Sequence, residues 1–141
     1  MNVSMKNSKK RIAIVWLVGA GIVFVVVVLQ SIRRVYGDKT SEAWAWYLPT
    51  VLPTLSLIVG VLASDALSTT KTVKTIDSFI YRLALALSIV YLTVVASTIL
   101  LSPFSGWTPL ELMKVSNLWL APLQGIVAAT IGVFFVSKDV T

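Results

Sequence analysis

The sequence predicts an all-α integral membrane protein, a four-helix bundle with short connections. Hydrophobic residues make up 57% of the 141 residues and charged residues only 13%, and the mean hydropathy is +0.88. This composition lies outside the range of soluble domains of this size. The hydrophobic residues gather in four runs, each long enough to cross a hydrocarbon core of about 30 Å as a helix. The whole chain, 1–141, is therefore expected to form a single membrane domain.

Four hydrophobic runs define the predicted spans. They cover residues 12–30, 44–63, 80–101 and 118–136. Strands of a transmembrane barrel would instead need segments of about ten residues with alternating polarity, whereas VFVVVVL at 23–29 is apolar on every side. The first run follows basic residues, as in a secretory signal, but QSIRRVYG after Leu29 offers no cleavage site with small residues. We therefore expect four retained helices.

Prolines stand inside the second and fourth predicted spans, at Pro49, Pro53 and Pro122. Proline has no N–H to donate to the carbonyl four residues back, so the second helix is expected to bend, with the Ala45 carbonyl left free. In lipid, such carbonyls need new donors. The side chains at hand are Thr50, Thr54 and Gln124. Two interpretations stay open: a kink that seats the helix around its neighbours, or an outer vestibule that guides a cation.

Polar side chains follow one face of the third span. They step by four and three residues alternately, which places them in one stripe on a helix. The stripe consists of Asp77, Tyr81, Ala84, Ser88, Tyr91, Val95 and Thr98. Such a face is unfavourable against lipid, so we expect it to turn inward. Three interpretations of the stripe stay open. It is a buried seam whose hydroxyls bond to backbone, a water-lined pathway, or a cleft for a lipid or small ligand.

Small residues are spaced for helix packing in two spans. Helices in lipid associate through close packing of small residues and through hydrogen bonds between helices. The second span carries Ser56, Gly60 and Ser64, and the fourth carries Gly125, Ala129 and Gly132. Both patterns predict contact with another helix.

The connection before the fourth span contains a helix start signal. Thr108 is followed by Pro109 and, three residues after the threonine, by Glu111. Threonine as the cap, proline at the first helical position and glutamate at the third are typical of a capping box. We expect a short interfacial helix here, separate from the fourth span, or else a structured loop.

Lysine and arginine are unevenly divided between the two sides of the predicted membrane. Eight lie on the side of the chain ends: Lys6, Lys9, Lys10, Arg11, Lys71, Lys74, Arg82 and Lys138. Four lie on the other side: Arg33, Arg34, Lys39 and Lys114. Since cytoplasmic flanks collect these residues, both termini are expected in the cytoplasm, with the chain in a plasma or inner membrane. On that side, Arg82 is expected to form an ion pair with Asp65 or Asp77.

The composition argues against an enzyme. Cysteine and histidine are absent, so thiol chemistry and the usual zinc and haem sites lack ligands, and we expect no metal and no cofactor. The serines and threonines have no base at membrane depth to activate them. No Asp, Glu, Lys or Arg lies in the centre of a predicted span to carry protons for a coupled transporter. The net charge of +6 is spread over tails and turns, so no nucleic-acid partner is expected.

Two functions fit these observations best. A homo-oligomeric channel or membrane-permeabilising pore is favoured, because so small a chain needs further copies to enclose water. Its candidate lining residues are Ser88, Tyr91, Thr98, Asn117 and Gln124. The alternative is a non-catalytic accessory or scaffold subunit that docks a larger membrane partner. A carrier of lipid or of a hydrophobic ligand is a third candidate and requires a lateral cleft; in every case the lipid bilayer is the immediate partner.

Overall fold

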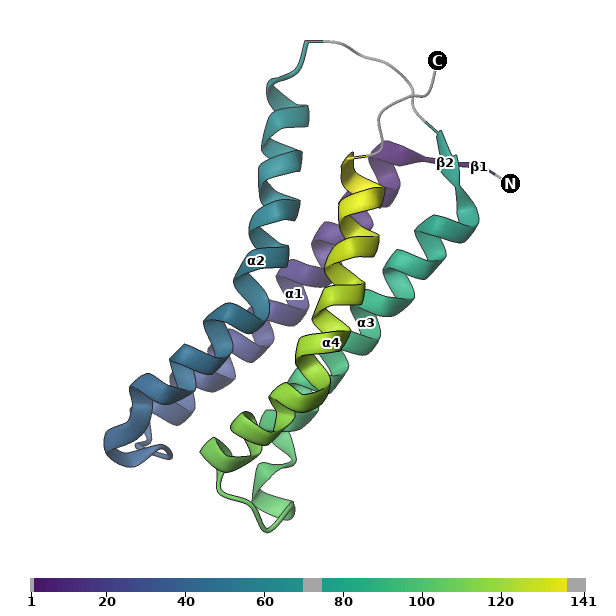
Figure 1. Ribbon diagram of the computed structural model, residues 1–141. Helices are drawn as coiled ribbons and strands as arrows, with labels where there is room; N and C mark the ends of the chain where they lie inside the picture. Colours follow the sequence, from purple (N-terminus) through teal and green to yellow (C-terminus); the bar gives the residue numbers. More distant parts are fainter. Residues whose placement is uncertain (1, 70–74, 137–141) are drawn as a thin grey trace.

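The computed structural model describes residues 2–69 and 75–136 and is dominated by four long helices (Figure 1). The elements in chain order are β1 (Asn2–Ser4), α1 (Met5–Ile32), a 3-10 turn (Gly37–Lys39), α2 (Thr40–Leu67), β2 (Thr75–Asp77), α3 (Ser78–Leu100), a second 3-10 turn (Ser102–Phe104) and α4 (Pro109–Val136). The predicted all-α class is confirmed, with the addition of one small two-stranded ribbon.

The helices run alternately up and down and form a ring in the order α1, α2, α4, α3 (Figure 1). The connections from α1 to α2 and from α3 to α4 lie at the same end of the bundle, here termed the loop end. The opposite end carries β1 and β2 and is termed the strand end. Because α1 and α3 both start at the strand end, they are parallel neighbours, as are α2 and α4 at the other side of the ring.

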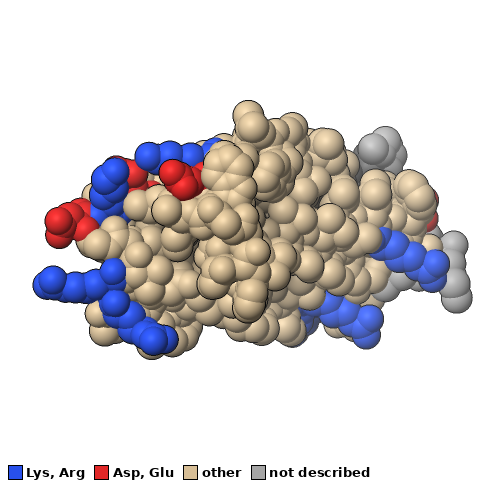
Figure 2. Space-filling model, turned by 90° about the horizontal axis from the view of Figure 1, so that it is seen from below, with Lys and Arg blue, Asp and Glu red and all other residues tan. Residues whose placement is uncertain are grey.

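All four helices are long and apolar enough to cross a membrane. Figure 2 shows the charged side chains gathered at the two ends of the molecule, with an uncharged belt between them. Large apolar side chains point outward from this belt, including Ile22, Val25 and Ile126, each more than half exposed at 58%, 54% and 56%. A soluble protein rarely exposes so large an apolar surface, whereas a bilayer covers it. The fold therefore supports a membrane location.

Three helices extend well beyond their predicted spans. α1 already begins at Met5, and α2 continues to Leu67. α4 begins at Pro109, where the Glu111 amide donates to Thr108 Oγ1 at 3.3 Å and the Thr108 amide donates to Glu111 Oε2 at 3.1 Å. The capping box is thus confirmed as a helix start. The separate interfacial helix is a wrong prediction, because the capped turn continues without a break into the span.

The pairing of β1 with β2 was not predicted. The two strands are antiparallel, with Asn2 opposite Asp77 and Ser4 opposite Thr75. The connection between α2 and α3 therefore ends in a strand that pairs with the start of the chain next to the start of α3. Lys71 and Lys74 of this connection, and Lys138 near the C-terminus, lie outside the described residues.

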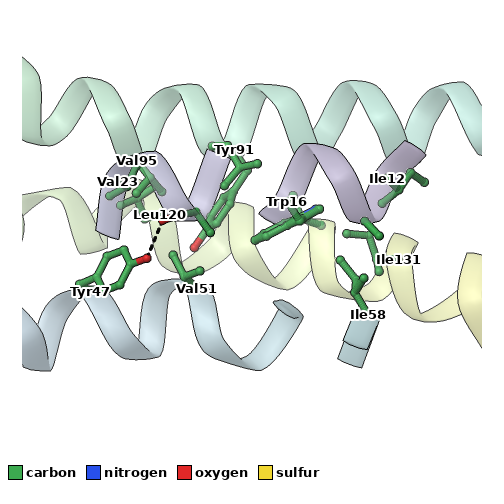
Figure 3. Packing of buried hydrophobic residues seen from close by; sticks show 14 of the residues in the cluster. Ile12, Trp16, Val23, Tyr47, Val51, Ile58, Tyr91, Val95, Leu120 and Ile131 are labelled. Atoms are coloured by element: carbon green, nitrogen blue, oxygen red, sulfur yellow. Dashed lines mark hydrogen bonds between the residues drawn. The ribbon is translucent and has the colours of Figure 1, made fainter. Parts of the chain in front are cut away.

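The core of the bundle is centred on Trp16 of α1 and Tyr91 of α3. Both side chains are fully buried, and their rings stack with centroids 5.7 Å apart. Figure 3 shows them among apolar side chains from α2 and α4, such as Ile58, Leu120 and Ile131. Large side chains from all four helices thus fill the middle of the protein.

Candidate functional site

The polar stripe of α3 faces the interior of the bundle. Its buried members are Tyr81, Ala84, Ser88, Tyr91, Val95 and Thr98, which confirms the predicted inward orientation. Ser88 Oγ donates to the Ala84 carbonyl at 2.7 Å, and Thr98 Oγ1 donates to the Val94 carbonyl at 2.9 Å. These hydroxyls are therefore satisfied within their own helix. Their bonding matches the buried-seam interpretation of the stripe.

The Tyr91 hydroxyl of the stripe connects α3 to the proline-containing part of α2. Tyr91 OH donates to the Thr50 carbonyl at 2.6 Å. Pro53 cannot donate to the Pro49 carbonyl, and Gln124 Nε2 of α4 donates to that carbonyl at 2.9 Å instead. We term Pro49, Thr50, Tyr91 and Gln124 the proline cluster. It joins three helices through backbone carbonyls that lie beside the interrupted part of α2.

Two threonines of α2 differ in how they satisfy their hydroxyls. Thr50 Oγ1 donates to the Trp46 carbonyl at 2.5 Å, within its own helix. Thr54 Oγ1 is buried and has no hydrogen-bond partner among the described residues. Of the three side chains proposed to compensate for the prolines, Gln124 thus bonds to a carbonyl freed by a proline, while Thr50 bonds one turn back.

The kinking prolines of α2 lie on the outward side of the helix. Pro49 and Pro53 are exposed, whereas Thr50 and Thr54 are buried. Figure 1 shows α2 changing direction along its length. A proline on the outer side of a helix favours curvature around the core, since the helix opens on that side. This geometry supports a kink that seats α2 around its neighbours.

Small residues form two outward stripes that no other part of the described chain covers. The α2 stripe comprises Pro49, Pro53, Ser56 and Gly60, and the α4 stripe comprises Pro122, Gly125 and Ala129. A Cβ atom placed on Gly60 or Gly125 would meet no atom within 4 Å. The outward residues of α1 are bulkier, as at Ile14, Val18 and Ile22. Another helix can therefore approach α2 and α4 more closely than α1.

The five candidate lining residues do not form one surface. Ser88, Tyr91 and Thr98 are buried between the helices, and Gln124 is half-buried in the proline cluster. Asn117 is exposed, in the loop-end half of α4. A path along all five would have to pass through side chains that are packed against one another.

The acidic residues of the strand end are bound differently from the prediction. Asp65 Oδ2 accepts from Lys9 Nζ at 2.7 Å, and Lys9 also lies over the Phe135 ring at 5.8 Å. Asp77 caps α3, since its carboxylate accepts from the Phe79 amide at 3.0 Å. Arg82 is exposed and, within the described part of the chain, pairs with neither acid. For Asp65 the physical reason is topological, because α2 and α3 are diagonal in the ring, whereas α1 lies next to α2. Asp77 lies on the same helix as Arg82, but its carboxylate is bonded to the first turn of α3.

Replacement of Lys9 by methionine should lower the free energy of unfolding by about 1–2 kcal/mol. The Lys9 side chain is 10% exposed, so its loss removes a desolvated partner, but Asp65 is 53% exposed and water replaces part of the interaction. Lys10→Met is the matched control, because Lys10 is exposed. Denaturation by SDS, followed by circular dichroism, measures both variants. Equal destabilisation by the two substitutions would show that the ion pair contributes nothing specific.

Sequence reasoning missed several contacts between helices. Trp46 Nε1 donates to Ser116 Oγ at 3.0 Å, and Tyr47 OH donates to the Ala20 carbonyl at 2.8 Å. Both donors belong to the aromatic-rich start of α2. Its composition indicates a membrane interface, but it does not show which acceptors these side chains bond to. The Lys9 contact was missed because a basic N-terminal flank is equally expected from topology alone.

The arrangement is one of packing and hydrogen bonding between helices, with uncovered small-residue stripes on two of them. Comparison of the chain with protein families, with curated proteins and with solved structures finds no match. Any functional conclusion therefore depends on the geometry of this chain.

Proposed function

We propose that this protein is the subunit of a homo-oligomeric membrane channel or pore whose path lies between protomers. The observation that carries the proposal is the contrast between the buried polar stripe of α3 and the uncovered stripes of α2 and α4. Because Trp16 and Tyr91 fill the middle of each protomer, a path needs outward-facing walls. The α4 stripe and the Gly60 end of the α2 stripe are the surfaces on which helices of adjacent protomers would meet.

The part of the α2 stripe nearer the loop end, from Pro49 to Ser56, is the best candidate for the wall of such a path. Ser56 provides an exposed hydroxyl, and Pro49 removes the helical donor of the Ala45 carbonyl. Within residues 2–69 and 75–136, no side chain donates to this carbonyl. A polar backbone group at this depth is tolerated where it faces water or another subunit. An assembled ring would supply either one.

The proposed membrane is a plasma or inner membrane, with the strand end in the cytoplasm. The support is the excess of Lys and Arg on the side of the chain ends. Labelling of single cysteines introduced at Ser4 and at Ser105, with a reagent that does not cross membranes, tests this orientation. Labelling at Ser105 and not at Ser4 in intact cells is the expected result.

Gly60→Leu should reduce ion flux through liposomes containing the protein by at least tenfold and should disperse the oligomer. The added side chain projects from the α2 stripe into space that is open in one protomer, so it interferes with a second protomer and not with folding. Gly21→Leu is the matched control, since a Cβ there also meets nothing within 4 Å but α1 carries no small-residue stripe. Flux of a fluorescent-reported ion and chemical cross-linking measure the two effects. Unchanged flux and cross-linking in Gly60→Leu would contradict the proposal.

An accessory or scaffold subunit is the second candidate. It is favoured by the way a single protomer satisfies the polar groups of α3, as in Ser88, Tyr91 and Thr98, without help from another chain. In that case the uncovered stripes dock a different membrane protein. A monomer in mild detergent, silent liposomes and one stoichiometric partner recovered from the native membrane would support this function and exclude the pore.

A further inference from the structure

A groove opens at the loop end, between the end of α1 and the connection from α3 to α4. Its volume is about 470 Å³, within the range of small-molecule sites. Its wall is mostly apolar and includes Val26, Leu29 and Pro103. Gln30 in the last turn of α1, Arg33 at its C-cap and Ser102 add polar side chains to the wall.

Arg33 gives this apolar groove a positive charge that nothing in its wall neutralises. No Asp or Glu is among the residues that line it. In the described part of the chain, Arg33 forms no ion pair either, since the ion pairs there join Lys9 to Asp65 and Lys114 to Glu42. A guanidinium presents several donors in a planar fork that matches the oxygens of a phosphate. The groove therefore combines an apolar wall with an unpaired site for an anion.

Gln30 is positioned to add a second donor. The hydroxyl of Tyr36 donates to Gln30 Oε1, and this bond occupies the amide oxygen. The phenol is protonated at neutral pH and acts as the donor in this bond; burial raises the pKa of Tyr36 further, to about 12. The Gln30 amide nitrogen, which has two N–H groups, is then directed away from Tyr36. Arg33 and Gln30 can thus donate to the same anion, whereas Ser102 Oγ, the third polar group of the wall, donates to the Ile99 carbonyl at 3.0 Å.

The backbone beside Arg33 places a second arginine where glycine is usual. The Val35 amide donates to the Gln30 carbonyl at 3.0 Å and the Arg34 amide to the Ser31 carbonyl at 3.1 Å, the two bonds of a Schellman helix end. Arg34 occupies its left-handed position, with φ of 55°. A residue with a Cβ is disfavoured in this conformation. Two adjacent cations, Arg33 and Arg34, therefore lie at this helix end, although the conformation of Arg34 is one that favours glycine.

We propose that this groove binds one phospholipid, with its phosphate at Arg33 and Gln30 and the start of an acyl chain beside Leu29 and Val26. Gln30 and Arg33 lie at the end of α1, where the first candidate span ends, and Figure 2 shows charged side chains at each end of an uncharged belt. The groove is therefore near the depth at which bilayer phosphates lie. Leu29 is 54% exposed, so the apolar wall is open to the lipid side. Anionic headgroups are preferred because Arg34 adds to the positive potential of Arg33.

Native mass spectrometry of the detergent-purified protein, with added dioleoylphosphatidylglycerol, tests this proposal. Arg33→Gln should retain about fivefold less lipid than the wild type, the effect of one basic residue near an anionic surface. Arg11→Gln is the matched control at the opposite end of α1 and should retain lipid as the wild type does. Leu29→Trp, which keeps Arg33 but fills the apolar wall, should also lose lipid.

Several outcomes would overturn the proposal. One is equal lipid retention by Arg33→Gln and the wild type; another is an equal loss in Arg11→Gln, which would indicate general charge attraction. Displacement of the lipid by glycerol 3-phosphate would identify the ligand as a soluble phosphate, whereas failure to displace it supports a bound lipid. Circular dichroism checks that the variants are folded. If Arg33→Gln is not folded, lipid retention by Leu29→Trp equal to that of the wild type would overturn the proposal. Lipid retention is measured independently of ion flux, so the proposed pore and the proposed lipid site can be refuted separately.

Discussion

Trp16→Ala should lower the free energy of unfolding by about 3 kcal/mol, at the lower end of the range for truncation of a buried aromatic side chain. Trp16 is fully buried and stacks on Tyr91, so alanine would leave a cavity between α1 and α3. The indole N–H has no acceptor among the described residues, and its removal relieves an unfavourable buried polar group. This relief offsets part of the lost packing and places the expected value near the lower limit.

Denaturation by SDS, followed by circular dichroism, measures this effect without relying on tryptophan fluorescence. Trp107→Ala is the matched control, because Trp107 lies at the loop end and is 50% exposed; it should change the free energy of unfolding by less than about 0.5 kcal/mol. Trp16→Phe keeps most of the ring and removes the N–H, so it should cost less than about 1.5 kcal/mol. A Trp16→Ala variant as stable as Trp107→Ala would mean that the core is not centred on Trp16.

The four spans and the inward face of α3 follow from sequence because each depends on a local pattern. A run of about twenty apolar residues needs no knowledge of its neighbours to be recognised as a span. The spacing of Tyr81, Ser88 and Thr98 places them on one helix face. Because a polar face is unfavourable against lipid, this face is expected to turn toward the interior of the bundle. The capping box at Thr108 is likewise local, and it did mark a helix start.

The helix ends and most partners do not follow from sequence, because they depend on the order of helices in the ring. Lys6, Lys9 and Lys10 precede the apolar run, and their sequence does not show that α1 already begins at Met5 and includes them. The choice of Lys9 over Arg82 as the partner of Asp65 follows from α1 lying next to α2. Three-residue strands near residues 3 and 76 have too few residues to show a periodicity of two.

The proline cluster was anticipated in part. A helix with two prolines must leave carbonyls free, and an amide such as Gln124 is one of few donors in the apolar fourth span. The Tyr91 bond to the Thr50 carbonyl was not anticipated, since it joins residues of two diagonal helices. Sequence identified the groups that need partners, and the fold decided which partners they have.

The double variant Tyr91→Phe with Gln124→Leu should lower the free energy of unfolding by about 3–4 kcal/mol, more than the sum of the two single effects. Each single variant should cost about 1 kcal/mol, typical of a hydrogen bond between helices in a membrane. Gln124 Nε2 also lies 3.4 Å from the Thr50 carbonyl, so it partly replaces the lost Tyr91 hydroxyl, and only the double variant leaves both carbonyls without a side-chain donor.

Ser88→Ala is the control for the double variant. It removes a buried hydroxyl of the same helix, but that hydroxyl bonds within α3, so the loss should stay below about 0.5 kcal/mol. A double variant no less stable than Ser88→Ala would show that the proline cluster does not hold α2 in place. Ion flux per folded protein then separates the two interpretations of the prolines: a kink predicts flux that follows the folded fraction, whereas a vestibule predicts altered flux in molecules that remain folded.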